Sequence, residues 1–451
     1  MDRQAVELFL KNASGLIWGW PLILSLMALG AYFSWKLKLL NPKALGLSFK
    51  YAMGNGTGTG DVSIFGSLCT ALSATLGTGN IVGMALAVTM GGPGALFWLW
   101  ISSILCLALK YAESLLAVKY RKIENDGTVS GGPMHYMSRG LGCPMLAKIF
   151  ALSGMAVALV GIGTLVQSNS IAATCDSFNI PRVPATAALT IIVAAITMGG
   201  LRKIAAVAEK IVPLMTIFYV GSAAIALIAN IGRLPKILCS IFHCAFAPRP
   251  VLFGGVSAAI AASIGVRRGI FSHESGLGSS AIAAAAARVD SPAKQGFASM
   301  AGAIFSVIVC TMTGLVVLMA CDDAPLVNSQ PMDGALLTSY AFGRGLGNAA
   351  IGKYVIGISI VLFAFTTIIG WNYYGEKCTQ YVFGKRAVFT YKLAFLCFVA
   401  IGPFFDMTSI FSVADTVTGI MAAVNLLGLA GLRKVVAEET DAFFATLRRT
   451  N

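Results

Sequence analysis

Long apolar stretches recur along the whole chain, and each comes close to the roughly 20 residues that a helix needs to cross a bilayer. Short loops rich in glycine, proline or charge separate them. The first stretch is too long for the apolar core of a signal peptide and lacks a convincing cleavage site, so we expect it to stay as a spanning helix. The pattern predicts an all-α polytopic membrane protein with eleven spans, at residues 14–36, 61–90, 94–118, 146–172, 185–201, 205–231, 253–284, 296–320, 350–382, 388–403 and 407–432.

The basic residues of the loops predict the direction in which the spans cross. With the N-terminus outside, 22 Lys and Arg fall on the inner side, eight fall on the outer side and three lie within spans. Positively charged loops stay on the cytoplasmic side. We therefore expect a protein of the plasma membrane, or of the inner membrane in a Gram-negative cell, with its N-terminus outside and a cytoplasmic tail at 433–451.

Two spans carry a glycine-broken centre. Without the first, peripheral span, the other ten divide into 61–231 and 253–432, and corresponding spans run in opposite directions. The first span of each five has a Gly-x-Gly cluster flanked by polar residues, at 76–80 and at 275–279. Matching interruptions of this kind are typical of transporters built from inverted repeats, with the whole chain as one domain. The alternative is that these glycines only kink the helices or let them pack closely.

A helix that is broken within the lipid has backbone groups that can bind a ligand. Unwinding leaves N–H and C=O groups without partners at a cost of several kcal/mol each, so the break persists only where something else satisfies them. The N–H groups that open the second half-helix can hold a carboxylate. The released carbonyls offer the oxygen ligands that hard cations prefer.

The composition excludes several classes of protein. Hydrophobic residues make up 57% of the chain and charged residues 12%, and the mean hydropathy is +0.79, which no ordinary soluble enzyme or DNA-binding protein has. The net charge of +14 comes from short loops rather than one polar face, so no nucleic-acid partner is expected. No obligatory protein partner is evident either, and the lipid bilayer is the surrounding medium.

An enzyme or an ATP-driven pump does not fit the remaining chemistry. The three histidines form no metal or haem pair, and the cysteines, including Cys239 and Cys244, have no common zinc spacing. Residues 54–60 are glycine-rich but lack the Lys-Ser/Thr that completes a phosphate loop. A passive channel remains as an alternative to a transporter.

Several motifs resemble one known family. The chain is similar to the alanine/glycine:cation symporter family in stretches that run in order through most of its length, at residues 70–81, 91–100, 110–113, 131–134, 167–170, 268–272, 276–279 and 370–377. The resemblance implies a sodium-driven importer of small neutral amino acids such as alanine, glycine and serine. It also implies a LeuT-like five-plus-five inverted-repeat fold with one extra N-terminal helix. Sodium is then co-transported rather than a prosthetic group, and coupling to protons stays open as an alternative.

The resemblance also implies a substrate site. Backbone N–H groups of the first break would hold the carboxylate of the amino acid, a glutamine would bind its ammonium group, and two aromatic rings would cover its side chain. Residues of the second break would line the other side. The residues concerned are Thr78, Gly79, Gln167, Phe271, Ser272, Gly276 and Trp371.

A sodium site is implied by the same fold. Thr366 and Thr367 lie in the middle of the ninth span and are spaced like its hydroxyl pair. By analogy with the fold, the carbonyls of Ser73 and Leu76 would complete the oxygen cage. Asn80 is a candidate ligand for a second cation. The alternative for the threonines is a hydrogen bond to the preceding turn of their own helix.

Departures from the family pattern and buried charges raise further expectations. His273 and Ser275 stand where family members commonly have Asn and Ala, which bears on substrate range or pH response. Glu274 could cap freed N–H groups, receive a proton or pair with Lys110, and we favour the pairing. Asp61 is expected to cap the helix of its span.

A gate is expected outside the site. Arg267 and Arg268 fall about one turn from the second break, and Asp415 lies toward the outer end of the last span. We expect one of the arginines to pair with Asp415 and close over the loaded site.

Overall fold

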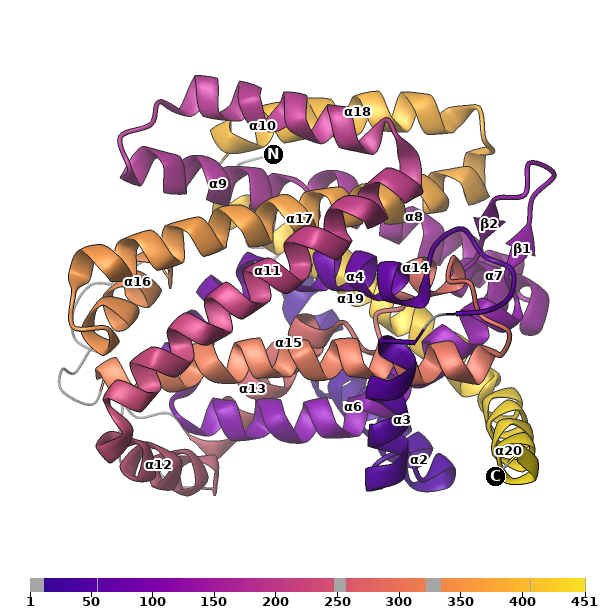
Figure 1. The fold of residues 1–451 in the computed structure, drawn as a ribbon, viewed down its shortest axis with the longest axis horizontal. Coiled ribbons are helices and arrows are strands. Elements are labelled where there is room, and N and C mark those ends of the chain that lie inside the picture. The colour runs from indigo at the N-terminus through magenta and orange to yellow at the C-terminus, as the bar shows by residue number, and fades with distance from the viewer. Residues whose placement is uncertain (1–11, 55, 247–256, 322–333, 406, 451) are drawn as a thin grey trace.

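The structure is a computed structural model that describes residues 12–54, 56–246, 257–321, 334–405 and 407–450. Apolar helices form one bundle around two large clusters of buried side chains. Figure 1 shows helices α12 and α16 at one end of this bundle, and the β1–β2 hairpin, α7 and the C-terminal helix α20 at the other end.

The first half of the chain, after a helix that begins at Asn12, contains α2 (Trp20–Leu37), α3 (Pro42–Ala52), α4 (Ile64–Thr75), the π-helix η1 (Gly79–Gly83), α5 (Met84–Gly91), α6 (Gly94–Lys119), β1 (Lys122–Ile123), β2 (Val129–Ser130), α7 (Pro133–His135), the π-helix η2 (Tyr136–Gly140), α8 (Pro144–Val160), α9 (Leu165–Ser177), α10 (Arg182–Thr197), α11 (Gly200–Ala229), the 3₁₀ turn η3 (Ile231–Arg233) and α12 (Leu234–Phe246).

The second half contains α13 (Ala258–His273), α14 (Ala281–Ala285), α15 (Pro292–Cys321), α16 (Gly334–Gly345), α17 (Ala349–Phe383), α18 (Ala387–Ile401), the 3₁₀ turn η4 (Gly402–Phe404), α19 (Met407–Gly431) and α20 (Arg433–Thr450).

Most of the predicted spans are helices of membrane-crossing length. Within the described residues, eight helices are long and apolar enough, and α4 with the segment Gly79–Gly91 makes a ninth span bent by 57°. The two other predicted spans do not meet that measure. Span 185–201 corresponds to α10, which has only 16 residues, and span 253–284 begins outside the described residues and is divided between α13 and α14.

The first break follows directly from its sequence. Helix α4 ends at Thr75, Leu76 leaves the helical region with φ −85° and ψ 87°, and the chain becomes helical again at Gly79. The expectation that Asp61 caps α4 is wrong, because Ser63 accepts the N–H of Gly66 at 2.8 Å in that role. Asp61 instead accepts the N–H of Val129 at 3.0 Å and so fastens the β-hairpin to the start of α4.

The second break is longer and uses left-handed backbone. Glu274, which follows α13, has φ +51°, and Gly276 and Gly278 have φ +92° and +78° before α14 begins. Glycine adopts such angles without steric cost. The two breaks predicted from the Gly-x-Gly clusters are therefore confirmed as interruptions of α4/α5 and α13/α14.

The extra N-terminal helix, Asn12–Leu37, packs against α6. A side chain at Gly30 would lie 2.6 Å from the carbonyl oxygen of Leu105, so glycine is needed for this close approach. Serine at position 34 adds a hydrogen bond from its hydroxyl to the same carbonyl at 3.3 Å.

The second break predicts the effect of filling a glycine. Replacing Gly278 by alanine adds a left-handed strain of about 1–2 kcal/mol and pushes a methyl group to 2.6 Å from Pro133 and 2.9 Å from Asn425. Gly384 has a similar φ of +83° with no atom within 4 Å, so Gly384→Ala isolates the backbone cost. We expect Gly278→Ala to lower the thermal unfolding midpoint of the purified protein clearly more than Gly384→Ala. Equal shifts would show that packing at the second break is loose.

Candidate functional site

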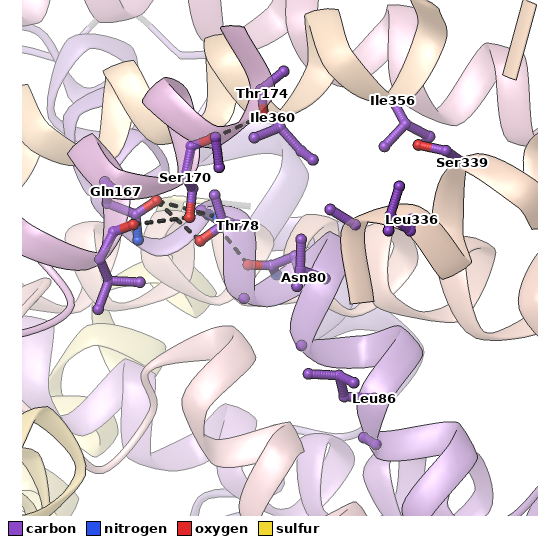
Figure 2. A pocket seen from close by; sticks show the side chains of 18 of the residues that line it. Thr78, Asn80, Leu86, Gln167, Ser170, Thr174, Leu336, Ser339, Ile356 and Ile360 are labelled. Atoms are coloured by element: carbon purple, nitrogen blue, oxygen red, sulfur yellow. Dashed lines mark hydrogen bonds between the residues drawn. The ribbon is translucent and has the colours of Figure 1, made fainter. Parts of the chain in front are cut away.

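A cavity of about 1430 Å³ lies beside the two breaks. It runs from residues 74–75 and 77–79 along α5 and α9 to exposed residues such as Met90 and Tyr340, which we call its open end. Figure 2 shows Gln167, Ser170 and Thr174 of α9 along one side, with Ile360 of α17 beside Thr174, and Leu336, Ser339 and Ile356 of α16 and α17 on the other side. Its wall is polar near the first break, and elsewhere apolar side chains alternate with polar and charged ones such as Ser339, Asn348 and Lys353.

The structure brings most of the predicted site residues to this cavity. Eleven of the fifteen line it, namely Thr78, Gly79, Asn80, Gln167, Arg267, Arg268, Phe271, Ser272, Thr367, Trp371 and Asp415. The four that do not line it are Ser73, Leu76, Gly276 and Thr366.

At the first break, Gln167 faces the backbone that unwinds. Its Oε1 atom accepts the hydroxyl of Thr78 at 3.1 Å and the N–H of Thr78 at 3.4 Å, as the dashed lines in Figure 2 show. Its amide nitrogen donates to the carbonyl of Ile162 at 2.9 Å, which fixes the orientation of the side chain. No atom lies within 4 Å of where a Cβ of Gly79 would be. The first break therefore presents backbone to open space, and the N–H of Thr78 is held there by a long hydrogen bond to a neutral acceptor.

Two aromatic rings border the same space. Phe271 lines the cavity from the end of α13, and Trp371 lines it from α17 while remaining 1% exposed. A side chain at Gly163 would lie 2.7 Å from Trp371, so the ring is held tightly from behind. The indole nitrogen of Trp371 is buried and has no protein partner among the described residues. Both rings therefore form part of the cavity wall.

The second break is occupied by a carboxylate of the protein itself. The Oε1 atom of Glu113, on α6, accepts the N–H groups of Gly276 at 2.9 Å and Gly278 at 3.0 Å and the amide of Asn425 at 2.7 Å. The N–H of Gly276 is thus bound to Glu113. The prediction that Gly276 lines the substrate site is wrong, because this residue does not border the cavity. Sequence reasoning noted Glu113 only as part of a motif, although an ionisable residue within a span was itself a signal of function.

The predicted sodium ligands are brought together in part. The hydroxyl of Thr367 lies 3.2 Å from the carbonyl oxygen of Leu76 and 2.8 Å from that of Phe363. The hydroxyl of Thr366 donates to the same carbonyl of Phe363 at 3.0 Å, so both threonines bond to the preceding turn of their own helix, but it faces the sulfur of Met215 at 3.5 Å instead of Leu76. No group of three or more His, Cys, Asp or Glu among the described residues could hold a metal. The oxygens of Leu76 and Thr367 are hard ligands that suit an alkali cation.

Asn80 belongs to a separate polar cluster. Its amide donates to Ser272 at 3.1 Å and Ser306 at 2.9 Å, while its Oδ1 atom accepts the N–H of Gly77 at 3.2 Å. Thr313 donates to the carbonyl of Asn80 at 3.0 Å. The cluster ties the restart of the first broken helix to α13 and α15.

The buried charges beside the second break are not arranged as expected. Lys110 donates to the carbonyl of His273 at 2.9 Å and so caps the end of α13. Glu274 accepts the hydroxyl of Ser279 at 2.6 Å. Lys110 and Glu274 form no contact ion pair in the described part of the chain, and the expected pairing is therefore limited to an attraction at longer range. The imidazole of His273 accepts the N–H of Ser275 at 3.0 Å and acts within its own loop.

Of the two arginines considered for a gate, Arg267 pairs with Asp415. Arg268 donates instead to the carbonyl of Gly83 at 2.8 Å and ties α13 to η1. The pair is about one-third exposed, and both of its residues line the cavity. In this conformation the Arg267–Asp415 pair is part of the cavity wall and does not seal it.

Two interrupted helices that meet at a cavity within an apolar bundle define a multi-pass membrane transporter and not an enzyme. The fold agrees with this, because the chain is similar to the crystal structure of MhsT in complex with L-phenylalanine, with a TM-score of 0.63 over 86% of this chain and 93% of that one. The sequences are only 13% identical, so the likeness concerns the fold alone. The predicted LeuT-like architecture is confirmed.

The chain belongs to the sodium:alanine symporter family, and its residues 3–451 match the sequence pattern of that family. It is 46% identical to an uncharacterized transporter of Haemophilus influenzae, over 98% of this chain and 97% of the relative. It is 38% identical to the sodium/alanine symporter AgcS of Methanococcus maripaludis, over 96% of each chain. It is 33% identical to the probable sodium/glutamine symporter GlnT of Bacillus subtilis, over 96% of this chain and 90% of the relative. The family resemblance seen in the motifs is therefore confirmed.

The contacts of Glu113 predict the effect of removing its charge. Hydrogen bonds to a charged acceptor are roughly twice as strong as those between neutral groups, so Glu113→Gln should weaken the second break by about 1–2 kcal/mol. We expect a lower thermal unfolding midpoint and slower transport. Glu438→Gln is the control, since Glu438 is an exposed carboxylate of α20 that does not line the cavity. Glu113→Gln with the midpoint of the wild type would refute this account of the second break.

Proposed function

We propose that the protein is a secondary active symporter that imports small neutral amino acids, alanine and glycine first and serine next, together with sodium. The first break supports this proposal most directly. Its N–H groups lie at the start of a half-helix, where the helix dipole favours an anion, and Gly79 leaves the approach open. The carboxylate of the amino acid would displace the oxygen of Gln167 from Thr78, and the freed glutamine oxygen would accept the ammonium group.

The choice of a small side chain rests on the rings of Phe271 and Trp371. Each lines the same cavity as Gly79, and Gly163 lies close behind Trp371, where even a Cβ would come within 2.7 Å of it. A pocket closed by rigid aromatic groups discriminates by size. The relative described as a probable sodium/glutamine symporter keeps glutamine as the second candidate substrate.

Coupling would arise because both ligands use the same unwound segment. A sodium ion between the carbonyl of Leu76 and the hydroxyl of Thr367 would order the break, and the ordered break would bind the carboxylate better. Linkage then requires that the amino acid strengthen sodium binding by the same factor. Rocking of the broken helices against the other spans would turn the site inward, with the Arg267–Asp415 pair as the outer gate, the N-terminus outside and the tail at 433–451 in the cytoplasm.

Uptake of radiolabelled alanine, glycine and glutamine into proteoliposomes tests the function. We expect accumulation of alanine and glycine above equilibrium when an inward sodium gradient is imposed, with glutamine competing weakly. Accumulation driven by a proton gradient without sodium would favour the proton-coupled alternative. Uptake that ignores both gradients would identify a passive channel.

The geometry of the threonine pair predicts a sharp difference between neighbouring variants. Thr367→Val removes the hydroxyl next to the carbonyl of Leu76 and should raise the sodium concentration for half-maximal uptake by about tenfold, which corresponds to about 1.4 kcal/mol. Thr366→Val, in which the lost hydroxyl faces Met215, is the matched control and should change it little. The reverse order in a sodium titration of uptake would place the cation on Thr366.

A further inference from the structure

The N-terminal helix reaches the gate residues with two side chains. Ser14 accepts a hydrogen bond from Arg267 at 3.2 Å, and the indole N–H of Trp18 donates to the backbone carbonyl of Asp415 at 2.9 Å. Both residues are buried, with Trp18 only 3% exposed. The helix that lies outside the two predicted five-span repeats therefore contacts both members of the Arg267–Asp415 pair.

Trp18 also contacts the aromatic side chain that borders the substrate space. Its ring centre lies 4.7 Å from that of Phe271, and the guanidinium carbon of Arg267 lies 5.7 Å from the Trp18 ring centre and 6.0 Å from that of Phe271. A cation held over two aromatic faces gains electrostatic attraction and loses freedom of rotation. Arg267 and Phe271 are one turn apart on α13, so Trp18 fixes both at once.

The ion pair needs such support. Arg267 and Asp415 are each about one-third exposed, and pairs open to water contribute little because water screens their attraction and long side chains lose entropy. Trp18 shields the guanidinium group on one face and adds a hydrogen bond at the backbone of Asp415. Trp18 therefore fixes the relative position of Arg267 and Asp415 and leaves their charges unchanged.

The packing of the N-terminal helix determines which neighbouring helices Trp18 contacts. Close packing at Gly30 seats the helix on α6, and α6 packs extensively with α13. At the other side, a Cβ at Gly419 of α19 would lie 2.5 Å from Ile17 and 2.8 Å from the indole nitrogen of Trp18. Trp18 thus stands at the junction between α13 and α19, and any separation of these two helices must break its contacts with one of them.

We propose that Trp18 is a positioning residue of the outer gate, which holds Arg267 against Asp415 and Phe271 toward the bound amino acid. The N-terminal helix then sets how long the loaded site stays closed. This inference rests on the proposed function, because it concerns retention of the transported amino acid.

Variants of Trp18 separate this role from simple packing. Trp18→Phe keeps a ring but loses the N–H, and Trp18→Ala loses both. We expect the KM for alanine and the rate at which bound alanine dissociates to rise about two- to threefold in Trp18→Phe and about five- to tenfold in Trp18→Ala, with a smaller change in kcat. Trp35→Phe is the matched control on the same helix, since Trp35 is 78% exposed, and it should behave as the wild type.

A double variant tests whether Trp18 acts through the ion pair. In an Asp415→Asn background, Trp18→Ala should raise KM by clearly less than it does alone, because the pair that it positions is already lost. Independent, multiplicative effects would overturn the proposal. So would a Trp18→Phe protein that keeps the wild-type elution profile and thermal midpoint and also keeps the wild-type KM and dissociation rate.

The outcomes distinguish this inference from the proposed function. A wild type that shows no sodium-driven uptake refutes the function itself. A wild type that transports, with Trp18 variants that match Trp35→Phe, refutes only the role of the N-terminal helix. If Trp18→Ala does not fold, the comparison of Trp18→Phe with Trp35→Phe decides the question.

Discussion

Backbone polar groups that leave a helix inside a membrane must find partners, and this requirement organises the centre of the molecule. The two breaks meet it in different ways. At the second, the charged carboxylate of Glu113 accepts two N–H groups at 2.9 and 3.0 Å. At the first, the neutral amide oxygen of Gln167 accepts the N–H of Thr78 at 3.4 Å. The weaker partner can be exchanged for a ligand, while the stronger one keeps the second break as a fixed wall.

Glycine decides how closely the first break and α17 approach. A Cβ on Gly77 would lie 2.8 Å from the hydroxyl of Thr367, and one on Gly370 would lie 2.6 Å from the hydroxyl of Ser73. Because both positions lack a side chain, the hydroxyl of Thr367 comes within 3.2 Å of the carbonyl of Leu76. The oxygen pair proposed for sodium is therefore a consequence of close helix packing as much as of the threonine itself.

The features that could be predicted from sequence are local ones. The breaks are visible because a Gly-x-Gly cluster with polar neighbours interrupts an otherwise apolar run, and apolar length locates most spans. The capping of α4 by Ser63 rather than Asp61 was missed because Asp61 is drawn to the distant hairpin at Val129. Spacing along the chain does not reveal such contacts.

The same limit applies to the charges and to the N-terminal helix. Lys110 and Glu274 have opposite charges in neighbouring elements, yet their partners are a carbonyl of α13 and the hydroxyl of Ser279. Trp18 is 397 residues from Asp415 in sequence, and nothing in its own helix indicates the contact. The Arg267–Asp415 pair could be predicted because opposite charges within spans seek each other, whereas the spacing of Glu113 along the chain does not reveal its contacts with the second break.

The starts and ends of the two broken helices are joined on the side away from the open end. The N–H of Asp61 donates to the carbonyl of Ala286 at 2.8 Å, the N–H of Arg288 donates to the carbonyl of Val62 at 2.8 Å, and Arg121 donates to the carbonyl of Ala287 at 2.8 Å. Strand-like bonds of this kind resist shear between the segments that they connect. These bonds therefore oppose a parting of α4 from α14 on that side, and they join the start of one broken helix to the end of the other.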